Sequence, residues 1–143
     1  MRSRIPKDQI DLLKAVPLFS SCSHSEVRTI ASLGTPVDVA EGTYLTRRGQ
    51  PGREFFLVLD GEASCRIGRK EVARFSSGDY FGELALLHGG IRTADVVAAT
   101  PMTLLVFDAR EFRSLLMTTP TISVKMLAHV AERLEEANAQ YSD

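Results

Sequence analysis

The sequence has few of the residues that mark a disulfide framework or a metal site. It contains two cysteines, three histidines and no tryptophan among 143 residues. Cys22 and Cys65 lie far apart and form no CxxC pair, which is typical of reduced thiols in a cytoplasmic protein. His24, His88 and His129 have no metal-ligand spacing. We therefore expect no metal, and no metal-dependent enzyme of the cupin kind, which clusters histidines and carboxylates.

Charge excess and long apolar runs are also missing. Lys and Arg number 17 against 18 Asp and Glu, so no basic excess exists to neutralise a phosphate backbone, and we expect no nucleic-acid binding by this chain alone. The longest apolar stretches, residues 55–59 and 102–107, are far too short to span a bilayer. The opening MRSRIPKDQ holds no apolar segment, so we expect no secretory signal and no membrane contact.

Three regions of different periodicity follow one another. Residues 7–34 have helical spacing, interrupted at Pro17 and resumed after a capping box of Ser23 and Glu26. Residues 36–108 are short runs of strand-forming residues cut by glycines. Residues 109–140 return to helical spacing. The order predicts one α+β domain over residues 1–143, an antiparallel β-roll or jelly roll between short N-terminal helices and two C-terminal helices.

The stretch FGELALLHGGIRTA, residues 81–94, interrupts the strand pattern. A helix-forming run begins at Gly82, where the missing side chain lets a ligand approach the backbone. The free N–H groups at a helix start attract anions, and the guanidinium of Arg92 can hold two phosphate oxygens. Glu83 fits if it accepts a hydrogen bond from a ribose 2′-OH. Considered one at a time, Glu83 and Arg92 are explained most simply as ordinary surface residues. Together, the pattern predicts a binding site for a nucleotide that carries one negative charge.

This stretch resembles the phosphate-binding cassette of the cyclic nucleotide-binding domain family, whose pattern is F-G-E-[LM]-[AG]-L, a short loop and R-[STA]-A. The matching residues are Phe81, Gly82, Glu83, Leu84, Ala85, Leu86, Arg92, Thr93 and Ala94. The family includes regulatory subunits of cAMP-dependent kinase, cyclic-nucleotide-gated channels and catabolite activator proteins. The resemblance extends over nearly the whole chain and implies a sensor or regulatory domain for a cyclic nucleotide, cAMP before cGMP, with no catalysis and no cofactor.

The resemblance implies a role for each cassette residue. Arg92 would bind the exocyclic phosphate oxygens, and Glu83 would accept the ribose 2′-OH. The supporting residues, which offer backbone amides, close approach or a hydroxyl, would be Gly82, Leu84, Ala85, Thr93 and Ala94. Threonine at position 93 does not decide between cAMP and cGMP.

Two further groups would contact the base. Strand alternation places Cys65 and Ile67 on one face, and by resemblance these two and Val72 line the base pocket, with plain core packing as an equal alternative. The helix over residues 121–139 has three candidate roles: packing on the domain's own roll, closing as a lid over the base, or joining two copies as a homodimer. Its dimer seam would be Leu127, Val130, Leu134 and Ala137. Its cap candidates are Met126, His129, Arg133 and Leu134.

The chain departs from the family pattern beside Arg92. Ile91 stands where proline is frequent, which would raise the cost of ordering the loop. Arg53 follows the Gly52 turn, where some members place an acid that orients the arginine, and Glu54 is the alternative orienting group. No recognition helix, channel helix or kinase motif is visible, so the downstream protein partner is unknown. Two alternatives remain: a ligand-silent protein-interaction domain, or a regulatory domain cut from a larger protein such as a channel or transcription regulator.

Overall fold

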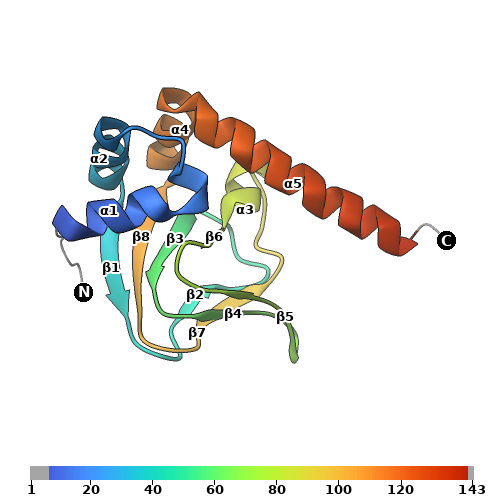
Figure 1. Cartoon of the computed structure of the whole chain (residues 1–143). Helices are drawn as coiled ribbons and strands as arrows, with labels where there is room; N and C mark the ends of the chain where they lie inside the picture. Colours follow the sequence, from blue (N-terminus) through green and yellow to red (C-terminus); the bar gives the residue numbers. More distant parts are fainter. Residues whose placement is uncertain (1–6, 142–143) are drawn as a thin grey trace.

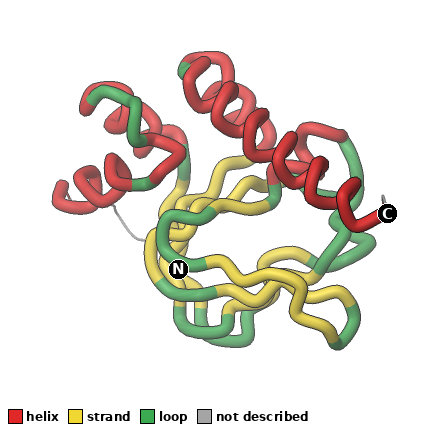
Figure 2. Tube along the Cα trace, turned by 45° about the vertical axis from the view of Figure 1, so that its right-hand side comes forward, coloured by secondary structure: helices red, strands yellow, loops and turns green. Residues whose placement is uncertain are grey.

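The computed structural model describes residues 7–141, which fold into two four-stranded antiparallel sheets with helices at one end (Figures 1 and 2). The elements are α1 (Lys7–Ala15), a short 3-10 helix η1 (Pro17–Phe19), α2 (His24–Leu33), β1 (Thr35–Val39), β2 (Tyr44–Thr46), β3 (Glu54–Asp60), β4 (Ala63–Ile67), β5 (Lys70–Phe75), β6 (Tyr80–Phe81), α3 (Glu83–His88), β7 (Asp95–Ala98), β8 (Met102–Asp108), α4 (Ala109–Thr118) and α5 (Pro120–Tyr141). The α+β roll expected from the sequence is confirmed.

The two sheets form the walls of the roll. One has the strand order β1-β8-β3-β6 and the other β2-β7-β4-β5. Figure 2 shows the two layers of strands facing each other, with the helices gathered at one end. The helix α3 interrupts the strand sequence between β6 and β7, so the cassette lies at the rim where the two sheets meet.

Local sequence signals explain where the helices begin. The Ser23 hydroxyl accepts a hydrogen bond from the Glu26 N–H, and the Glu26 carboxylate accepts one from the Ser23 N–H, so the expected capping box opens α2. Asp108 and Glu111 form a second box that opens α4. These boxes satisfy N–H groups that a helix start otherwise leaves unpaired.

Two apolar clusters hold the roll and its helices together. The β3 run is buried on both faces: Phe55 and Leu57 pack with the helices, while Phe56 and Val58 pack between the sheets. This double burial explains why the strand reads as continuous apolar residues rather than alternating ones. Each large side chain buried in this way contributes about 1.5–3 kcal/mol of transfer free energy. Phe56 also stacks on Phe81, at 4.8 Å between ring centroids, which anchors the strand leading into the cassette.

The helix α5 begins in the core and then runs out past the end of the roll (Figure 1). Ile122 and Met126 are 0 % and 2 % exposed and belong to the helical cluster. Leu127 and Leu134 are 67 % and 61 % exposed, so the expected dimer seam faces outward and its pairing stays a prediction. The side chain of Ala137, the last residue of that seam, lies outside the described residues. The first turns thus pack on the domain's own core.

Candidate functional site

The cassette is a short helix held between two glycines in the left-handed region. Gly82 has a φ of 94° and Gly89 a φ of 65°, and these two residues flank α3. A Cβ on Gly82 would lie 2.7 Å from the Glu54 carbonyl oxygen and 2.9 Å from Nη1 of Arg92. Position 82 therefore requires glycine both for its backbone conformation and for the closeness of its neighbours.

Arg92 is buried against main-chain oxygens. It is 8 % exposed, its Nη1 donates to the Gly82 carbonyl at 3.0 Å, and its Nη2 donates to the Glu54 carbonyl at 2.6 Å. Burial lowers the pKa of Arg92, while the Glu54 and Glu83 carboxylates act in the opposite direction. The guanidinium keeps its charge at neutral pH. Among the described side chains it forms no ion pair, so its charge remains available to an anion.

The sequence left open which group orients Arg92. In the structure, backbone carbonyls orient it. The Glu54 carbonyl, rather than its carboxylate, holds the Arg92 side chain. The Arg92 main chain is fixed as well, because its N–H donates to the Gln50 carbonyl at 2.8 Å and its carbonyl accepts from the Gly49 N–H at 2.9 Å. Ile91, which stands where the family pattern often has proline, forms a β-bridge with Pro51. This pairing restrains the loop without the proline.

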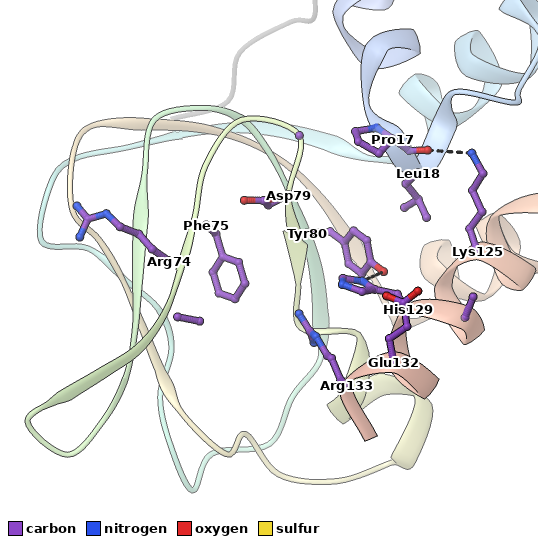
Figure 3. Close-up of a pocket in the computed structure, with 13 residues that line it drawn as sticks. Pro17, Leu18, Arg74, Phe75, Asp79, Tyr80, Lys125, His129, Glu132 and Arg133 are labelled. Carbon is purple, nitrogen blue, oxygen red and sulfur yellow. Dashed lines mark hydrogen bonds between the residues drawn. The ribbon is translucent and has the colours of Figure 1, made fainter. Parts of the chain in front are cut away.

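Glu83 lies at the start of α3 and is 2 % exposed. Its Oε1 is 3.2 Å from Nη1 of Arg133, which reaches it from α5. Figure 3 shows the Arg133 side chain projecting from α5 toward the roll. The Arg133 side chain remains 41 % exposed, so the pair joins a buried carboxylate to a partly solvated cation. The residue expected to accept the ribose hydroxyl is thus connected to the C-terminal helix.

A cavity of about 130 Å³ brings most of the expected residues together. Arg133 and the thiol-bearing strand β4 close two of its sides. Its lining includes the expected residues Cys65, Gly82, Glu83, Leu84, Arg92, Thr93, Ala94 and Arg133. Ala85 is not among the lining residues; it is 8 % exposed, and a Cβ built on Gly52 would lie 2.2 Å from its Cβ. Burial raises the pKa of the Cys65 thiol, so this wall of the cavity is neutral.

Ile67 and Val72 are placed differently from Cys65. They are 41 % and 47 % exposed and do not line the cavity. The pairing of β4 with β5 shifts between Cys65 and Arg66, which face Ala73 and Glu71 and leave Val72 without a partner. The extra residue, Val72, makes a bulge in β5 and interrupts the alternation of faces in that strand. The base-pocket role of these two residues stays a prediction.

The four cap candidates occupy four different environments. Met126 is in the helical core, Leu134 is 61 % exposed, and Arg133 reaches the cavity. His129 does not line the 130 Å³ cavity; its Nδ1 is hydrogen-bonded to the Tyr80 hydroxyl at 2.8 Å (Figure 3). These two residues border a second cavity of about 550 Å³ between α5 and the strands β5 and β6. Arg133 is thus the cap candidate with a direct connection to the cassette.

Sequence reasoning missed several contributors to this region. Thr46, Phe75 and Val96 line the smaller cavity, and Tyr80 fixes His129. Burial, and secondly the Glu83 carboxylate, raise the pKa of Tyr80 to about 12. The phenol is therefore protonated at neutral pH. The position of Tyr80 immediately before the cassette was the one available signal, since strand pairing alone brings Thr46 and Phe75 to the cavity.

Within residues 7–141, no three His, Cys, Asp or Glu side chains are grouped to hold a metal ion. No helix in the same range has the length and apolar character needed to cross a membrane.

Comparison with known proteins identifies the family. Residues 36–119 match the family described as cyclic nucleotide-binding domain. The chain belongs to this family. It is 40 % identical over 106 residues to a cAMP-dependent protein kinase regulatory subunit of Schizosaccharomyces pombe, covering 73 % of this chain and 26 % of that protein. The chain therefore spans about a quarter of the length of this relative.

Solved structures of the family superimpose on most of the cyclic nucleotide-binding domain. The Thermus thermophilus catabolite activator protein has a TM-score of 0.81 and 27 % identity, covering 87 % of this chain and 61 % of that one. The cAMP-bound PfPKA-R has a TM-score of 0.82 and 27 % identity, covering 96 % of this chain and 48 % of that one. The domain described here shares the fold of these two proteins.

Proposed function

We propose that this domain binds cAMP in preference to cGMP and transmits its occupancy through α5. The observation that carries the proposal is Arg92, a buried cation held by two carbonyls and in ion-pair contact with no carboxylate within residues 7–141, at the edge of a cavity that Glu83 also lines. A cation in this state gains more from a bound anion than an exposed one does, because folding has already removed most of its water. A phosphodiester fits the fork of a guanidinium.

The remaining residues complete the proposed site. Glu83 accepts the ribose 2′-OH, and the glycine conformation at position 82 lets the ligand approach the backbone. Since Glu83 also holds Arg133, the ligand hydroxyl and α5 interact with the same carboxylate. Ligand binding shifts the equilibrium between an open and a closed position of α5 only by as much as the affinity of the ligand differs between these two positions.

The preference for cAMP is supported by the relatives. The Schizosaccharomyces pombe protein is a cAMP-dependent kinase regulatory subunit, and the PfPKA-R structure contains cAMP. We infer from the same relatives that the domain regulates a partner protein and is not itself an enzyme. A cytoplasmic location, expected from the sequence, agrees with this role and stays a prediction.

Thermal unfolding with cAMP, cGMP and 5′-AMP in parallel tests the proposal. Ligand at a hundred times its Kd stabilises the folded state by about 2.7 kcal/mol, which raises the Tm by roughly 5–11 °C for a domain of this size. We expect the largest rise with cAMP, a smaller rise with cGMP and none with 5′-AMP. If none of the three nucleotides raises the Tm, the proposal is contradicted and the ligand-silent interaction domain is favoured.

Two variants make the test specific. Arg92→Lys keeps the charge but loses the two-pronged grip, so we expect the cAMP-induced shift to disappear while the unliganded domain still unfolds cooperatively. Arg113→Lys, at an exposed position on α4, is the matched control and should keep the full shift. An unchanged cAMP response in Arg92→Lys would remove Arg92 from the site.

A further inference from the structure

Positive charge is concentrated in the loop between β2 and β3. Residues 47–53, RRGQPGR, contain three arginines and no carboxylate, in a chain whose net charge is −1. Among the side chains that the structure describes, the arginines found in ion pairs are Arg74 and Arg133, and neither belongs to this loop. The charge of this loop is therefore not neutralised within the described part of the domain.

Two of these arginines border a cleft behind the cassette. The cleft has a volume of about 280 Å³ and is lined by Tyr44, Leu45, Thr46, Arg47, Gln50, Pro51, Arg53, Glu54 and Arg92. We call it the arginine cleft. Three of its lining residues are arginines and one is a carboxylate, so its charge balance favours an anion. It adjoins the 130 Å³ cavity, with which it shares Thr46 and Arg92.

The arginine cleft is built on fixed backbone. Its loop pairs with the cassette through the Gly49, Gln50 and Arg92 hydrogen bonds and the bridge between Pro51 and Ile91. The Arg47 guanidinium lies over the Tyr44 ring, 4.0 Å from its centroid, and this cation–π contact limits its rotation. A surface with arginines held in this way loses less entropy on binding than one with free side chains.

The chemistry of the cleft points to carboxylates on a peptide. Arginine forks bind carboxylates with two parallel hydrogen bonds. Beside them are apolar surfaces, namely the half-exposed Tyr44 ring and the Ile91 side chain, which is 60 % exposed. A nucleic acid would need a longer basic track than one loop, and the rest of the chain is not basic. A peptide segment that carries carboxylates beside an apolar side chain would match both the arginines and the apolar surfaces.

We propose that the arginine cleft docks an acidic segment of a partner protein, with its carboxylates on Arg47 and Arg53 and an apolar side chain against Tyr44 and Ile91. The cleft shares Thr46 and Arg92 with the cavity proposed for the cyclic nucleotide, but its proposed contacts are on Arg47, Arg53, Tyr44 and Ile91. Its test therefore leaves Arg92 and Glu83 unchanged.

The probe is a fluorescein-labelled acidic peptide, EELEE, with QQLQQ as the uncharged counterpart, and the readout is fluorescence anisotropy with the intact domain. We expect saturable binding of EELEE and none of QQLQQ. Binding should weaken steeply between about 50 and about 200 mM salt, because charge contacts are screened. The double variant Arg47→Glu/Arg53→Glu should lower the affinity for EELEE by about tenfold or more.

Arg28→Glu/Arg113→Glu is the matched control, since it changes the net charge equally at exposed positions on α2 and α4. We expect it to retain the parental affinity. Arg53→Gln, a milder change, repeats the test if the double variant does not fold. A cAMP-induced Tm shift that persists in these variants shows that the cyclic nucleotide site is intact.

Three results would overturn the proposal. They are no saturable EELEE binding to the parent domain, an equal loss in the Arg28→Glu/Arg113→Glu control, or displacement of the peptide by inorganic phosphate at a lower concentration than the peptide's own Kd. The last result would assign the cleft to a small anion. Each can occur whether or not the domain binds cAMP, so failure here is distinguishable from failure of the proposed function.

Discussion

The carboxylate of Glu83 and the guanidinium of Arg133 form an ion pair at 3.2 Å that joins the cassette to α5. Glu83 is 2 % exposed, so its charge depends on this partner much more than an exposed carboxylate would. The partner comes from a different region of the chain, fifty residues away in sequence. The position of α5 and the state of Glu83 are thus physically linked.

Arg133→Ala should destabilise the unliganded domain. The change leaves a buried carboxylate without its charged partner, and such a loss costs about 1–3 kcal/mol. Urea unfolding followed by circular dichroism measures the difference. In Glu83→Gln the charge is absent, so the further change Arg133→Ala should cost less there than in the parent. A double-mutant cycle with no coupling would show that the pair contributes nothing.

Gly52→Ala should weaken ligand binding by crowding Arg92. A Cβ on Gly52 would lie 2.2 Å from the Ala85 Cβ and 2.9 Å from Nε of Arg92. Crowding of this kind costs about 1–3 kcal/mol, and the shift of the guanidinium should reduce affinity for cAMP in calorimetry. Gly90→Ala is the control, because its Cβ would meet nothing closer than 3.6 Å. If both variants bind like the parent, close packing at Gly52 does not position Arg92.

Met126→Ala and Leu134→Ala should distinguish the packed part of α5 from its exposed part. Met126 is 2 % exposed and packs in the helical cluster, so its truncation should lower the free energy of unfolding by about 2–5 kcal/mol. Leu134 is 61 % exposed, and its truncation should change stability by less than about 0.5 kcal/mol. Chemical denaturation without ligand tests both values. A large loss in Leu134→Ala would mean that the outer part of α5 is packed in solution.

Stability should fall with rising pH between about 10 and 12 because of Tyr80. Its folded-state pKa is raised from its ordinary value near 10 to about 12, so in this window the folded state keeps the proton that the unfolded state has lost. The slope from this group is at most about 1.4 kcal/mol per pH unit. Tyr80→Phe should remove that slope. The measurement is the difference in urea midpoint between the parent and Tyr80→Phe across this pH range, where a constant difference would contradict the assignment.

Much of the fold could be predicted because its signals are local. The capping box of Ser23 and Glu26, the break at Pro17 and the glycine-cut strands depend on neighbours in the chain, and each appears where it was expected. The cassette is also local, since Gly82, Glu83 and Arg92 lie within eleven residues, and the cavity contains all three. Local order of this kind is visible in one sequence.

The strand pair predicted to face the base could not be read in the same way. The glycine turns and the resemblance placed Val72 with Cys65 and Ile67, but the extra residue that β5 carries at Val72 depends on how β5 pairs with β4. Pairing between strands is set by the packing of both faces, and the residues of one strand do not reveal it. The sequence could not distinguish between the cap candidates on α5 for a related reason. Helical spacing alone puts Met126, His129 and Arg133 on neighbouring positions of one side of the helix.

The sequence by itself determined the family, the order of the elements and the chemical groups of the cassette, because these depend on residue type and short spacing. Only the tertiary structure decided what those groups contact. It placed the Glu54 and Gly82 carbonyls on Arg92, Arg133 on Glu83, and Arg47 and Arg53 at a common cleft. Backbone carbonyls have no residue-specific signature, and contacts across fifty residues follow from the packing of sheets and helices rather than from local propensity.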